Sequence, residues 1–557
     1  MQGFDETFDW VVIGSGSGSM CSALVMRRAG KSAVILEKTG LVGGTTAKSG
    51  GMMWIPNNRF IRAAEPAESA EKAMQYLDAV CGDSPDTPGT NRENRQAYVD
   101  EAPRMLDFII EQGVEMERAT TYWPDYYDEL PGGCKTSRVV GARYFNLKEL
   151  GAWEKRLQPG FLPFPSKLDD GMRVAFRNKS WRLRLLFAKI AFRVVLARVT
   201  GKSYTTAGAA LQGRMLKAAL AAGVDIRTDS PVRELILDAD RVVGVVAECG
   251  GRRVRIGANL GVLVNAGGFA RNQQMRDKFM PGTRADWSNV PEGDTGDMHI
   301  ELERRGAVLA QMDQMVGFQT TITPNFAKEF VKPPGQSLTG RPGAILVDQS
   351  GVRYLNEGGS YELYCETMLK RNRTVPAIPS WAIFDQRYAE DYQVAGQWVG
   401  KARKPEGFLE SGYLKIAQSI EELARLVGVD PATLAATVKR WNGFVEKGVD
   451  EDFGRGVREY DKWLGDPFWA PNPALGKIEK APFYAVNIVP SDVGTYGGVL
   501  IDSKARVKKA NGEPIKGLYA CGVTTASIFG GVYPGAGASV GPSMTFGYIA
   551  AKHAAAL

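Results

Sequence analysis

A short run of alternating glycine and serine near the N-terminus constrains the fold of this chain more than any other feature. An apolar segment at 10–13 precedes it, helical apolar spacing follows at 21–28, and a second apolar segment at 32–36 ends at Glu37. A glycine turn between strand and helix, with an acidic residue about 20 positions further on, is typical of dinucleotide binding. The sequence therefore predicts a strand–helix–strand dinucleotide site whose turn is Gly14, Ser15, Gly16, Ser17, Gly18 and Ser19.

The positions of this turn have separate expected roles. Gly14 allows the tight turn, Gly16 lets the pyrophosphate approach the backbone, and Glu37 binds a ribose hydroxyl with Lys38 beside it. Ser19 stands where a third glycine is usual, and Gly18 lies one place earlier. Because serine is small enough to keep helix and strand close, we expect the site to form.

A second glycine-rich segment, "GLVGGTTAKSGGMMWIP", follows at 40–56. Two glycine doublets bracket small hydroxyl residues, so the backbone can run flat along a ligand and donate N–H groups to phosphate and ring. A plain NAD-binding unit does not need such a segment. The expected contacts are Gly43, Gly44, Thr45, Thr46, Lys48, Ser49, Gly50 and Gly51.

Composition narrows the class of protein. A chain of 557 residues forms two or more domains, and a formal charge of +7 without a polybasic tail or nucleic-acid motif argues against a nucleic-acid partner. The six cysteines contain no CxxC pair, which predicts reduced thiols and no metal site. The N-terminus enters an apolar run directly and lacks signal-peptide features, so we expect a cytoplasmic protein.

These segments resemble the FAD-binding domain of the fumarate reductase and succinate dehydrogenase flavoprotein superfamily. "VNAGGFARN" and "GLYACGVTTASIFGG" match further flavin-contacting stretches of that superfamily. The resemblance implies FAD and adds the contacts Val232, Ala266, Gly267, Gly268, Gly522, Ala538, Ser539 and Val540.

Histidine is scarce in this chain. The only two are His299 and His553, and neither lies near the second glycine-rich segment. Dicarboxylate chemistry and a covalent flavin both use histidine in the superfamily, so the sequence favours non-covalent FAD and another reaction.

Three tyrosine motifs suggest which reaction. They are "PDYY" at 124–127, "GVRYLNEGGSYELY" at 351–364 and "YPGAG" at 533–537, and together they resemble the 3-ketosteroid Δ1-dehydrogenases. The resemblance implies a steroid substrate and a site made of Tyr126, Tyr361, Tyr533 and Gly537. Serine at 360 stands where that family usually has proline, so Tyr364 remains a rival of Tyr361, as Tyr127 does of Tyr126.

The expected chemistry suits these residue types. Removal of hydrogen from C1 and C2 of a 3-oxo ring separates into a hydride, passed to flavin N5, and a proton. The Tyr533 hydroxyl and the Gly537 N–H, beside a helix expected to start near 541–542, would stabilise the enolate oxygen. Tyr361 would accept the C2 proton with Tyr126 assisting, because ionising a lone tyrosine at neutral pH costs about 4 kcal/mol.

The order of the motifs predicts an α/β fold with a discontinuous Rossmann-like FAD-binding domain. We expect its first part at 1–290, an inserted α+β substrate domain at 297–480, and its C-terminal part at 485–557. A cleft between the two domains would hold the steroid.

A basic amphipathic stretch at 173–202, within an insert at about 165–205, differs from its surroundings. Arg182, Lys189 and Arg193 share one helical face, and Leu183, Leu186, Phe187, Ile190 and Val194 cover others. Charges interrupt it too often for a transmembrane helix. It is either an interfacial helix resting on the inner membrane surface or a core helix covered by arginine stems.

A membrane-resting enzyme would suit a sterol such as cholest-4-en-3-one, with a quinone or redox protein as electron acceptor. Three alternatives stay open: a 3-ketosteroid Δ4-(5α)-dehydrogenase, a fumarate-reductase-like enzyme, and a flavin-binding sensor without turnover.

Overall fold

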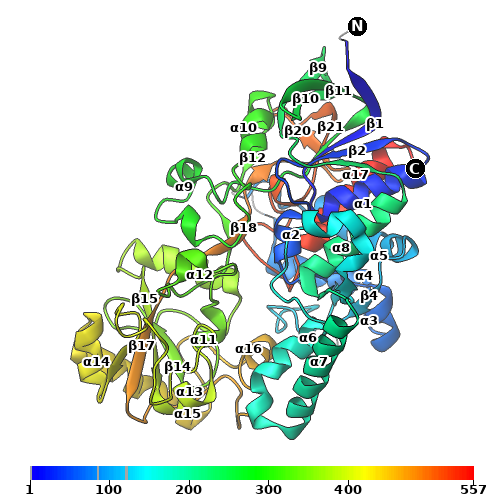
Figure 1. The fold of residues 1–557 in the computed structure, drawn as a ribbon. Helices are drawn as coiled ribbons and strands as arrows, with labels where there is room; N and C mark the ends of the chain where they lie inside the picture. Colours follow the sequence, from blue (N-terminus) through cyan, green and yellow to red (C-terminus); the bar gives the residue numbers. More distant parts are fainter. Residues whose placement is uncertain (1–2, 84–86, 120–122) are drawn as a thin grey trace.

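The computed structural model describes residues 3–83, 87–119 and 123–557 and divides into two sheet-centred parts (Figure 1). The first contains an eight-stranded sheet in the order β20-β21-β10-β11-β1-β2-β8, with β9 paired to β10. Its strands are β1 (Glu6–Ile13), β2 (Ala33–Leu36), β8 (Asp225–Arg227), β9 (Val232–Asp238), β10 (Arg241–Cys249), β11 (Arg252–Val264), β20 (Arg506–Lys508) and β21 (Pro514–Ala520).

The parallel core of this sheet is formed by β21, β11, β1, β2 and β8. β11 serves two pairings: its first half is antiparallel to β10, and its second half is parallel to β1 and β21. β1 and β2 are apolar and buried at their carboxyl ends, as expected for parallel strands covered on both faces. The predicted Rossmann-like fold is confirmed.

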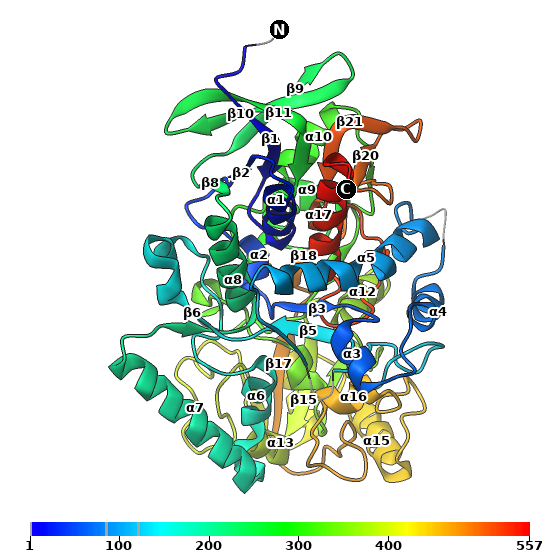
Figure 2. The same ribbon diagram turned by 90° about the vertical axis from the view of Figure 1, so that its right-hand side faces the viewer.

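Helices from distant parts of the sequence cover this sheet (Figure 2). α1 packs against both α17 and α8, and α5 packs against α17. The helices of this part are α1 (Ser17–Arg28), α2 (Gly44–Lys48), α3 (Arg59–Ala64), α4 (Ala70–Val80), α5 (Arg92–Glu111), α8 (Ala207–Ala221), α9 (Gln273–Phe279), α10 (Asp297–Arg304) and α17 (Val540–Ala554), with the short turns η3 (Ala285–Trp287) and η5 (Gly522–Thr524).

A small antiparallel sheet lies beside the glycine segments. β3 (Met52–Trp54) and β4 (Met116–Arg118) flank β5 (Val139–Ala142), and β6 (Phe145–Asn146) pairs with β7 (Tyr204–Thr205). The chain between β6 and β7 forms η1 (Leu147–Arg156) and the insert, which contains α6 (Leu168–Arg173), η2 (Val174–Lys179) and α7 (Trp181–Val199).

The second part is built on a four-stranded antiparallel sheet in the order β14-β15-β17-β16. Its strands are β14 (Ala344–Val347), β15 (Ser380–Asp385), β16 (Lys415–Ala417) and β17 (Phe483–Ile488), and its helices are α11 (Gln336–Thr339), α12 (Tyr361–Asn372), α13 (Gln386–Asp391), α14 (Ile420–Val427), α15 (Pro431–Lys447) and α16 (Glu459–Leu464), with η4 (Phe326–Lys328). α15 shows why these helices form: Asp430 accepts the Thr433 N–H, Pro431 opens the first turn, and Gly448 ends the helix in the left-handed conformation.

The chain returns from the second part later than the sequence predicts. The expected boundary at 485 falls inside β17, which pairs along its full length with β15. Two short ladders then join the parts: β13 (Met315–Gly317) with β18 (Asp492–Thr495), and β12 (Leu309–Ala310) with β19 (Gly498–Val499). Residues 485–488 therefore belong to the four-stranded sheet of the second part, because their backbone groups complete its ladder.

α7 lies at the periphery of the molecule in both views (Figures 1 and 2). Leu183, Ile190 and Ala197 face the protein, whereas much of the rest of the helix is exposed. Within the described part of the chain, no helix combines the length and the apolarity that crossing a bilayer requires.

Candidate active site

The first glycine turn is closely packed against the elements around it. Gly14 adopts φ +89°, and a Cβ there would lie 2.3 Å from the Asn265 carbonyl oxygen. A Cβ on Gly18 would lie 2.4 Å from the Ser543 carbonyl oxygen, so Gly18 allows α1 to approach α17 closely. The Ser19 hydroxyl instead lies 3.0 Å from the Asn265 side-chain amide. Gly18 thus takes the packing role that the third glycine of the pattern usually has.

Polar side chains connect this turn to the second glycine-rich segment. Ser15 Oγ donates to Glu37 Oε2 at 2.6 Å and accepts the Gly43 N–H at 2.8 Å. Ser17 Oγ lies 3.4 Å from Thr46 Oγ1. Lys38 points elsewhere: its Nζ donates to Thr295 Oγ1 at 2.6 Å and pairs with Asp297 at 2.8 Å.

The second segment bends sharply around α2. Gly43, Gly44 and Gly51 all have positive φ, and a Cβ on Gly51 would lie 2.4 Å from the Gly208 N, at the start of α8. A Cβ on Gly44, in contrast, would point into open space, and one on Gly50 would touch only the Leu168 side chain. Ser49 Oγ donates to the Thr46 carbonyl and accepts the Gly51 N–H, which fixes the turn after α2.

Lys48 closes this segment in an electropositive environment. Its ammonium lies 4.6 Å from the centre of the Phe330 ring. Burial first, and the neighbouring Arg271 and Lys332 next, lower the pKa of Lys48 to about 8. The predicted cofactor contact is therefore a cation with reduced affinity for its proton.

The other predicted flavin segments meet at the carboxyl ends of β11 and β21. Thr524 Oγ1 accepts the Ala266 N–H and donates to the Gly267 carbonyl, both at 3.0 Å. Gly267 and Gly522 have positive φ, and a Cβ on either would lie within 2.5 Å of a side-chain oxygen. Ala538 and Ser539 precede α17, which begins at Val540, whereas Val232 lies at the start of β9.

These segments fit FAD. Neither N-cap residue, Gly16 of α1 or Ser539 of α17, makes a side-chain cap hydrogen bond, so N–H groups at the start of both helices can face phosphate or an electron-rich ring edge. The open space beside Gly44 and the close packing behind Gly18 form a cradle that side chains would fill. Gly14, Gly16, Ser17 and Gly44 would hold the pyrophosphate side, and the start of α17 would face the flavin ring.

Three tyrosines from distant motifs converge beside this cradle. The ring of Tyr126 lies 5.4 Å from that of Tyr361 and 5.8 Å from that of Tyr533, between centroids. Tyr361 and Tyr533 are 5.4 Å apart. Tyr126 comes from the loop before β5, Tyr361 is the first residue of α12, and Tyr533 precedes α17. The two parts of the molecule therefore contribute to one cluster.

Tyr533 and Gly537, the expected donor pair, lie in one tightly packed turn before α17. The Tyr533 hydroxyl lies 3.1 Å from Ser539 Oγ. Gly537 has φ +90°, and a Cβ there would lie 2.1 Å from the Met52 carbonyl oxygen. The turn is thus packed tightly against β3.

Burial dominates the electrostatics of the cluster. It raises the pKa of Tyr361 well above the ordinary value, and the neighbouring Tyr126 and Tyr533 raise it further. Burial raises the pKa of Tyr533 as well, but hydrogen bonds with Ser539, Tyr361 and Gly537 oppose that rise. The tyrosines are therefore neutral at physiological pH, and a proton must leave the cluster before Tyr361 can accept another.

The structure separates the rival tyrosines. Tyr126, not Tyr127, lies against Tyr361 and Tyr533; the Tyr127 N–H donates to the Tyr76 hydroxyl at 3.3 Å. Tyr364 is buried in the core of the second part, where its hydroxyl meets Thr339 Oγ1 at 3.1 Å. Neither rival belongs to the cluster.

An aromatic column that the sequence motifs do not indicate extends the cluster. Tyr460 packs 4.1 Å from Tyr126, Trp463 lies 5.6 Å from Tyr460, and Trp123 lies 4.7 Å from Trp463. Gln336 Nε2 donates to the Tyr460 hydroxyl at 3.1 Å. The only available signal was that Tyr460 and Trp463 are three residues apart and so share a face of α16.

Comparisons with known proteins agree with this geometry. The profile of the FAD binding domain family matches residues 9–540. A 3-oxosteroid 1-dehydrogenase of Mycobacterium tuberculosis is 35% identical over 568 residues, covering 99% of this chain and 98% of that protein. A 4-oxocyclohexanecarboxylate 2-dehydrogenase of Sinomonas cyclohexanicum is 33% identical over 579 residues, covering 98% and 92%.

A solved structure is similar over its whole length. The crystal structure of 3-ketosteroid Δ1-dehydrogenase from Sterolibacterium denitrificans, in complex with 1,4-androstadiene-3,17-dione, superposes with a TM-score of 0.92 at 31% identity. The match covers 99% of this chain and 100% of that one.

Proposed function

The chain belongs to the FAD binding domain family and to the group that includes the 3-oxosteroid 1-dehydrogenases, and from this we propose that it dehydrogenates 3-oxo-Δ4 steroids between C1 and C2. The observation that carries the proposal is the convergence of Tyr126, Tyr361 and Tyr533 beside the FAD cradle. The bound ligand of the Sterolibacterium structure, a 1,4-diene-3-one, has the product's double bond.

The donor pair would hold the substrate's C3 carbonyl. The Tyr533 hydroxyl and the Gly537 N–H stabilise the negative charge that develops on that oxygen when the C2–H bond breaks. Because the turn packs tightly against Met52, the two donors are held in place and need not move during the reaction. This makes the C2 proton acidic enough for a tyrosine to remove.

Tyr361 would remove that proton through an ionised phenol oxygen. Because burial raises its pKa, ionisation depends on the neighbouring hydroxyls of Tyr126 and Tyr460, which can pass the phenol proton away from the substrate. The chemistry that FAD supplies when bound is acceptance of the hydride from C1. Loss of the C2 proton and the C1 hydride together forms the C1=C2 bond.

Reoxidation requires an electron acceptor, for which we propose a quinone or a small redox protein. Either acceptor is consistent with an enzyme at the inner membrane surface. The exposed side chains of α7 support that location. At 100° per residue, Leu185, Phe192, Leu196 and Val199 share one face of α7, opposite the packed Leu183 and Ile190. Their exposed fractions run from 49% to 79%.

Basic residues flank this exposed apolar face. Arg182, Lys189 and Arg193 project beside it, and α7 contains no acidic residue. Apolar side chains flanked by cations are typical of helices that lie in the interface of anionic membranes. We propose that α7 rests on the membrane and that the substrate is a membrane-borne sterol such as cholest-4-en-3-one.

A monocyclic oxo acid is the second candidate substrate, because the Sinomonas relative is named for one. The same proton and hydride chemistry applies to its ring ketone. Such a substrate would also need a cation for its carboxylate. The residues packed around the cluster, Phe318, Tyr460 and Trp463, favour an apolar ring system instead.

Anaerobic bleaching of the flavin tests the function. We expect androst-4-ene-3,17-dione and cholest-4-en-3-one to bleach it, a dye to restore the colour, and NMR of the product to place the new double bond at C1–C2. Bleaching by 5α-reduced steroids with a new C4–C5 double bond would favour the Δ4-(5α) alternative. Bleaching by 4-oxocyclohexanecarboxylate alone would favour the oxo acid.

A further inference from the structure

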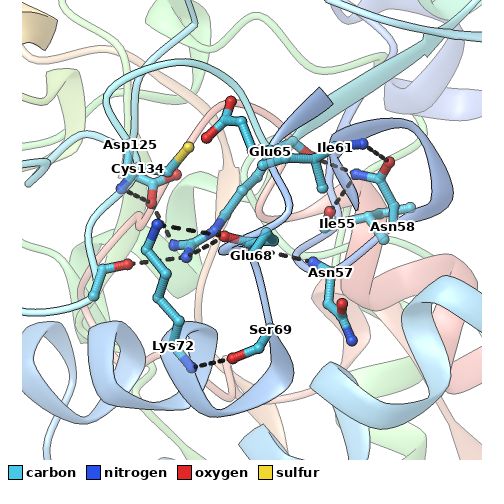
Figure 3. Close-up of polar contacts among 12 residues, drawn as sticks. Ile55, Asn57, Asn58, Ile61, Glu65, Glu68, Ser69, Lys72, Asp125 and Cys134 are labelled. Atoms are coloured by element: carbon cyan, nitrogen blue, oxygen red, sulfur yellow. Dashed lines mark hydrogen bonds and ion pairs between the residues drawn. The ribbon is translucent and has the colours of Figure 1, made fainter. Parts of the chain in front are cut away.

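Three charged residues form a fully buried cluster behind the tyrosines. Arg138 donates to both Glu68 oxygens, at 2.8 and 3.1 Å, and to Asp125 Oδ2 at 2.6 Å. Figure 3 shows the side chains of Glu68, Asp125 and Lys72 around this cluster. The side chains of Glu68 and Arg138 have no exposed surface, and Asp125 is equally buried. Buried ion clusters of this kind are often no more stabilising than apolar side chains of the same volume. The contacts that these three residues make with neighbouring segments therefore indicate their role better than any contribution to the stability of the fold.

The cluster fixes the loop that carries Tyr126. Asp125 directly precedes Tyr126; its N–H donates to the Cys134 carbonyl at 2.9 Å, and its Oδ2 accepts the Cys134 N–H at 3.0 Å. Arg138 Nη2 donates to the Gly132 carbonyl within the same loop at 2.9 Å. Both ends of the loop are thus held by Asp125 and Arg138.

The same cluster contacts the turn that carries the oxyanion donors. Trp54 Nε1 donates to Asp125 Oδ1 at 2.7 Å, and the Trp54 ring packs so closely on Gly535 that a Cβ there would lie 2.3 Å from it. The Arg138 guanidinium lies 5.5 Å from the Tyr76 ring, and the Tyr76 hydroxyl donates to the Pro534 carbonyl at 2.6 Å.

A direct bond completes the connection between the two loops. The Tyr126 N–H donates to the Pro534 carbonyl at 3.0 Å, so Tyr126 and Tyr76 share one acceptor. We propose that Asp125, Arg138 and Glu68 are positioning residues that set the distance between the relay tyrosine Tyr126 and the donor pair Tyr533–Gly537. This inference rests on the proposed function.

The charge of Asp125 makes the arrangement sensitive to pH. Burial raises the pKa of Asp125 to about 6, although Arg138, Trp54 and the Cys134 N–H oppose the rise and Glu68 adds to it. Other groups that face the cluster are Lys72, 3.8 Å from Glu68, the neutral Tyr76, and the Cys134 thiol, whose pKa is raised by burial and by Asp125. Below about pH 6 Asp125 is protonated and loses its ion pair with Arg138, so the dehydrogenation rate falls.

The test measures the rate of flavin bleaching by androst-4-ene-3,17-dione against pH in the FAD-loaded protein. Asp125→Asn is expected to lower that rate 10- to 100-fold at saturating steroid and to keep the steroid dissociation constant within threefold. It should also abolish the acidic limb of the pH profile, which is the fall in rate below about pH 6. Glu68→Gln is expected to move the limb to lower pH, because it removes the charge that raises the pKa of Asp125. Glu65→Gln is the matched control: Glu65 pairs with Arg118 at 2.7 Å on the same segment and touches neither Asp125 nor Trp54.

The outcomes distinguish failure of the positioning role from failure of the proposed function. The positioning role alone is overturned if the parent protein bleaches normally and both Asp125→Asn and Glu68→Gln behave like Glu65→Gln. The comparison covers the bleaching rate and its fall at acidic pH. Parent protein that no 3-ketosteroid bleaches overturns the proposed function and this inference with it. If Asp125→Asn fails to fold, the limb of Glu68→Gln decides, and an unshifted limb overturns the proposal.

Discussion

The ring of Tyr361 lies 5.4 Å from that of Tyr533, at an interplanar angle of 49°, although the two residues come from different parts of the molecule. Tyr361 is the first residue of α12 in the second part, and Tyr533 precedes α17 in the first part. A base and an oxyanion donor must face one substrate at the same time, which requires the two domains to be held together. The β13–β18 and β12–β19 ladders provide that connection.

Tyr361→Phe is expected to abolish turnover while leaving steroid binding nearly intact. The substitution removes the proposed base and keeps the ring, so the loss falls on the chemical step, by about 10²–10⁴-fold. Stopped-flow bleaching at saturating androst-4-ene-3,17-dione measures the rate, and perturbation of the flavin spectrum measures binding. Tyr364→Phe is the matched control, because Tyr364 is on the same helix but bonds Thr339 in the core. A larger loss in Tyr364→Phe would reverse the assignment.

Gly537→Ala is expected to damage both folding and catalysis. Alanine at φ +90° is strained by about 1–3 kcal/mol, and its Cβ would also collide with the Met52 carbonyl. The turn must shift, which moves the N–H from the substrate oxygen and lowers the bleaching rate by about tenfold or more. Thermal denaturation and stopped-flow bleaching report the two effects.

Gly30→Ala is the control that separates backbone strain at positive φ from collision of the new Cβ with neighbouring atoms. Gly30 has φ +73°, but a Cβ there would meet no atom within 4 Å. We expect it to lower the melting temperature less than Gly537→Ala and to leave the bleaching rate unchanged. Equal effects of the two substitutions on the rate would argue against an oxyanion role for Gly537.

Local sequence patterns predicted the local parts of the site well. The ends of β1, α1 and β2 and the start of α17 follow from short-range rules and agree with the structure to within a residue or two, whereas β1 and α1 begin about four residues before their apolar runs. The role of Gly18 did not follow from the pattern, because it depends on Ser543 of α17. The 485 boundary failed for the same reason: only pairing with β15 assigns 485–488 to the second sheet.

Long-range contacts account for what the sequence could not indicate. Glu68 and Arg138 match no motif, and Asp125 lies in the PDYY segment without any sign of a charged partner, so nothing local predicts their ion cluster. Tyr460 reaches Tyr126 only because α16 packs beside the loop. α7 is apolar on several sides, and only its packing reveals which face remains exposed.

The flavin is expected to be non-covalent. Neither histidine lies in the glycine segments: His299 is buried on α10 against Phe269, and His553 Nδ1 meets the Tyr519 hydroxyl at 2.9 Å. Burial lowers the pKa of His299 to about 4, so it is a neutral core residue. Acid precipitation should release yellow flavin into the supernatant, as measured by its absorbance. Colour that stays in the pellet would contradict this.

The last prediction concerns the exposed apolar face of α7. Sequence spacing alone would select Leu186, Phe187 and Ile190 for substitution, but Ile190 is buried against the protein and its loss would destabilise the fold. Leu185, Phe192 and Leu196 are exposed, so their replacement by serine should leave folding and flavin content unchanged. Each large apolar side chain withdrawn from water contributes roughly 1.5–3 kcal/mol, so the triple variant should lose sedimentation with anionic phospholipid vesicles.

The substrates then distinguish delivery from chemistry in this triple variant. Activity on soluble androst-4-ene-3,17-dione should persist, because the tyrosine cluster lies away from α7. Activity on cholest-4-en-3-one in vesicles should fall, since the enzyme no longer rests on the surface that holds its substrate. Ile190→Ser is the control: it should lower the melting temperature yet keep vesicle binding in the folded fraction, because its side chain faces inward. A triple variant that still sediments with vesicles, or one that loses its flavin, would show that this face of α7 serves another purpose than membrane contact.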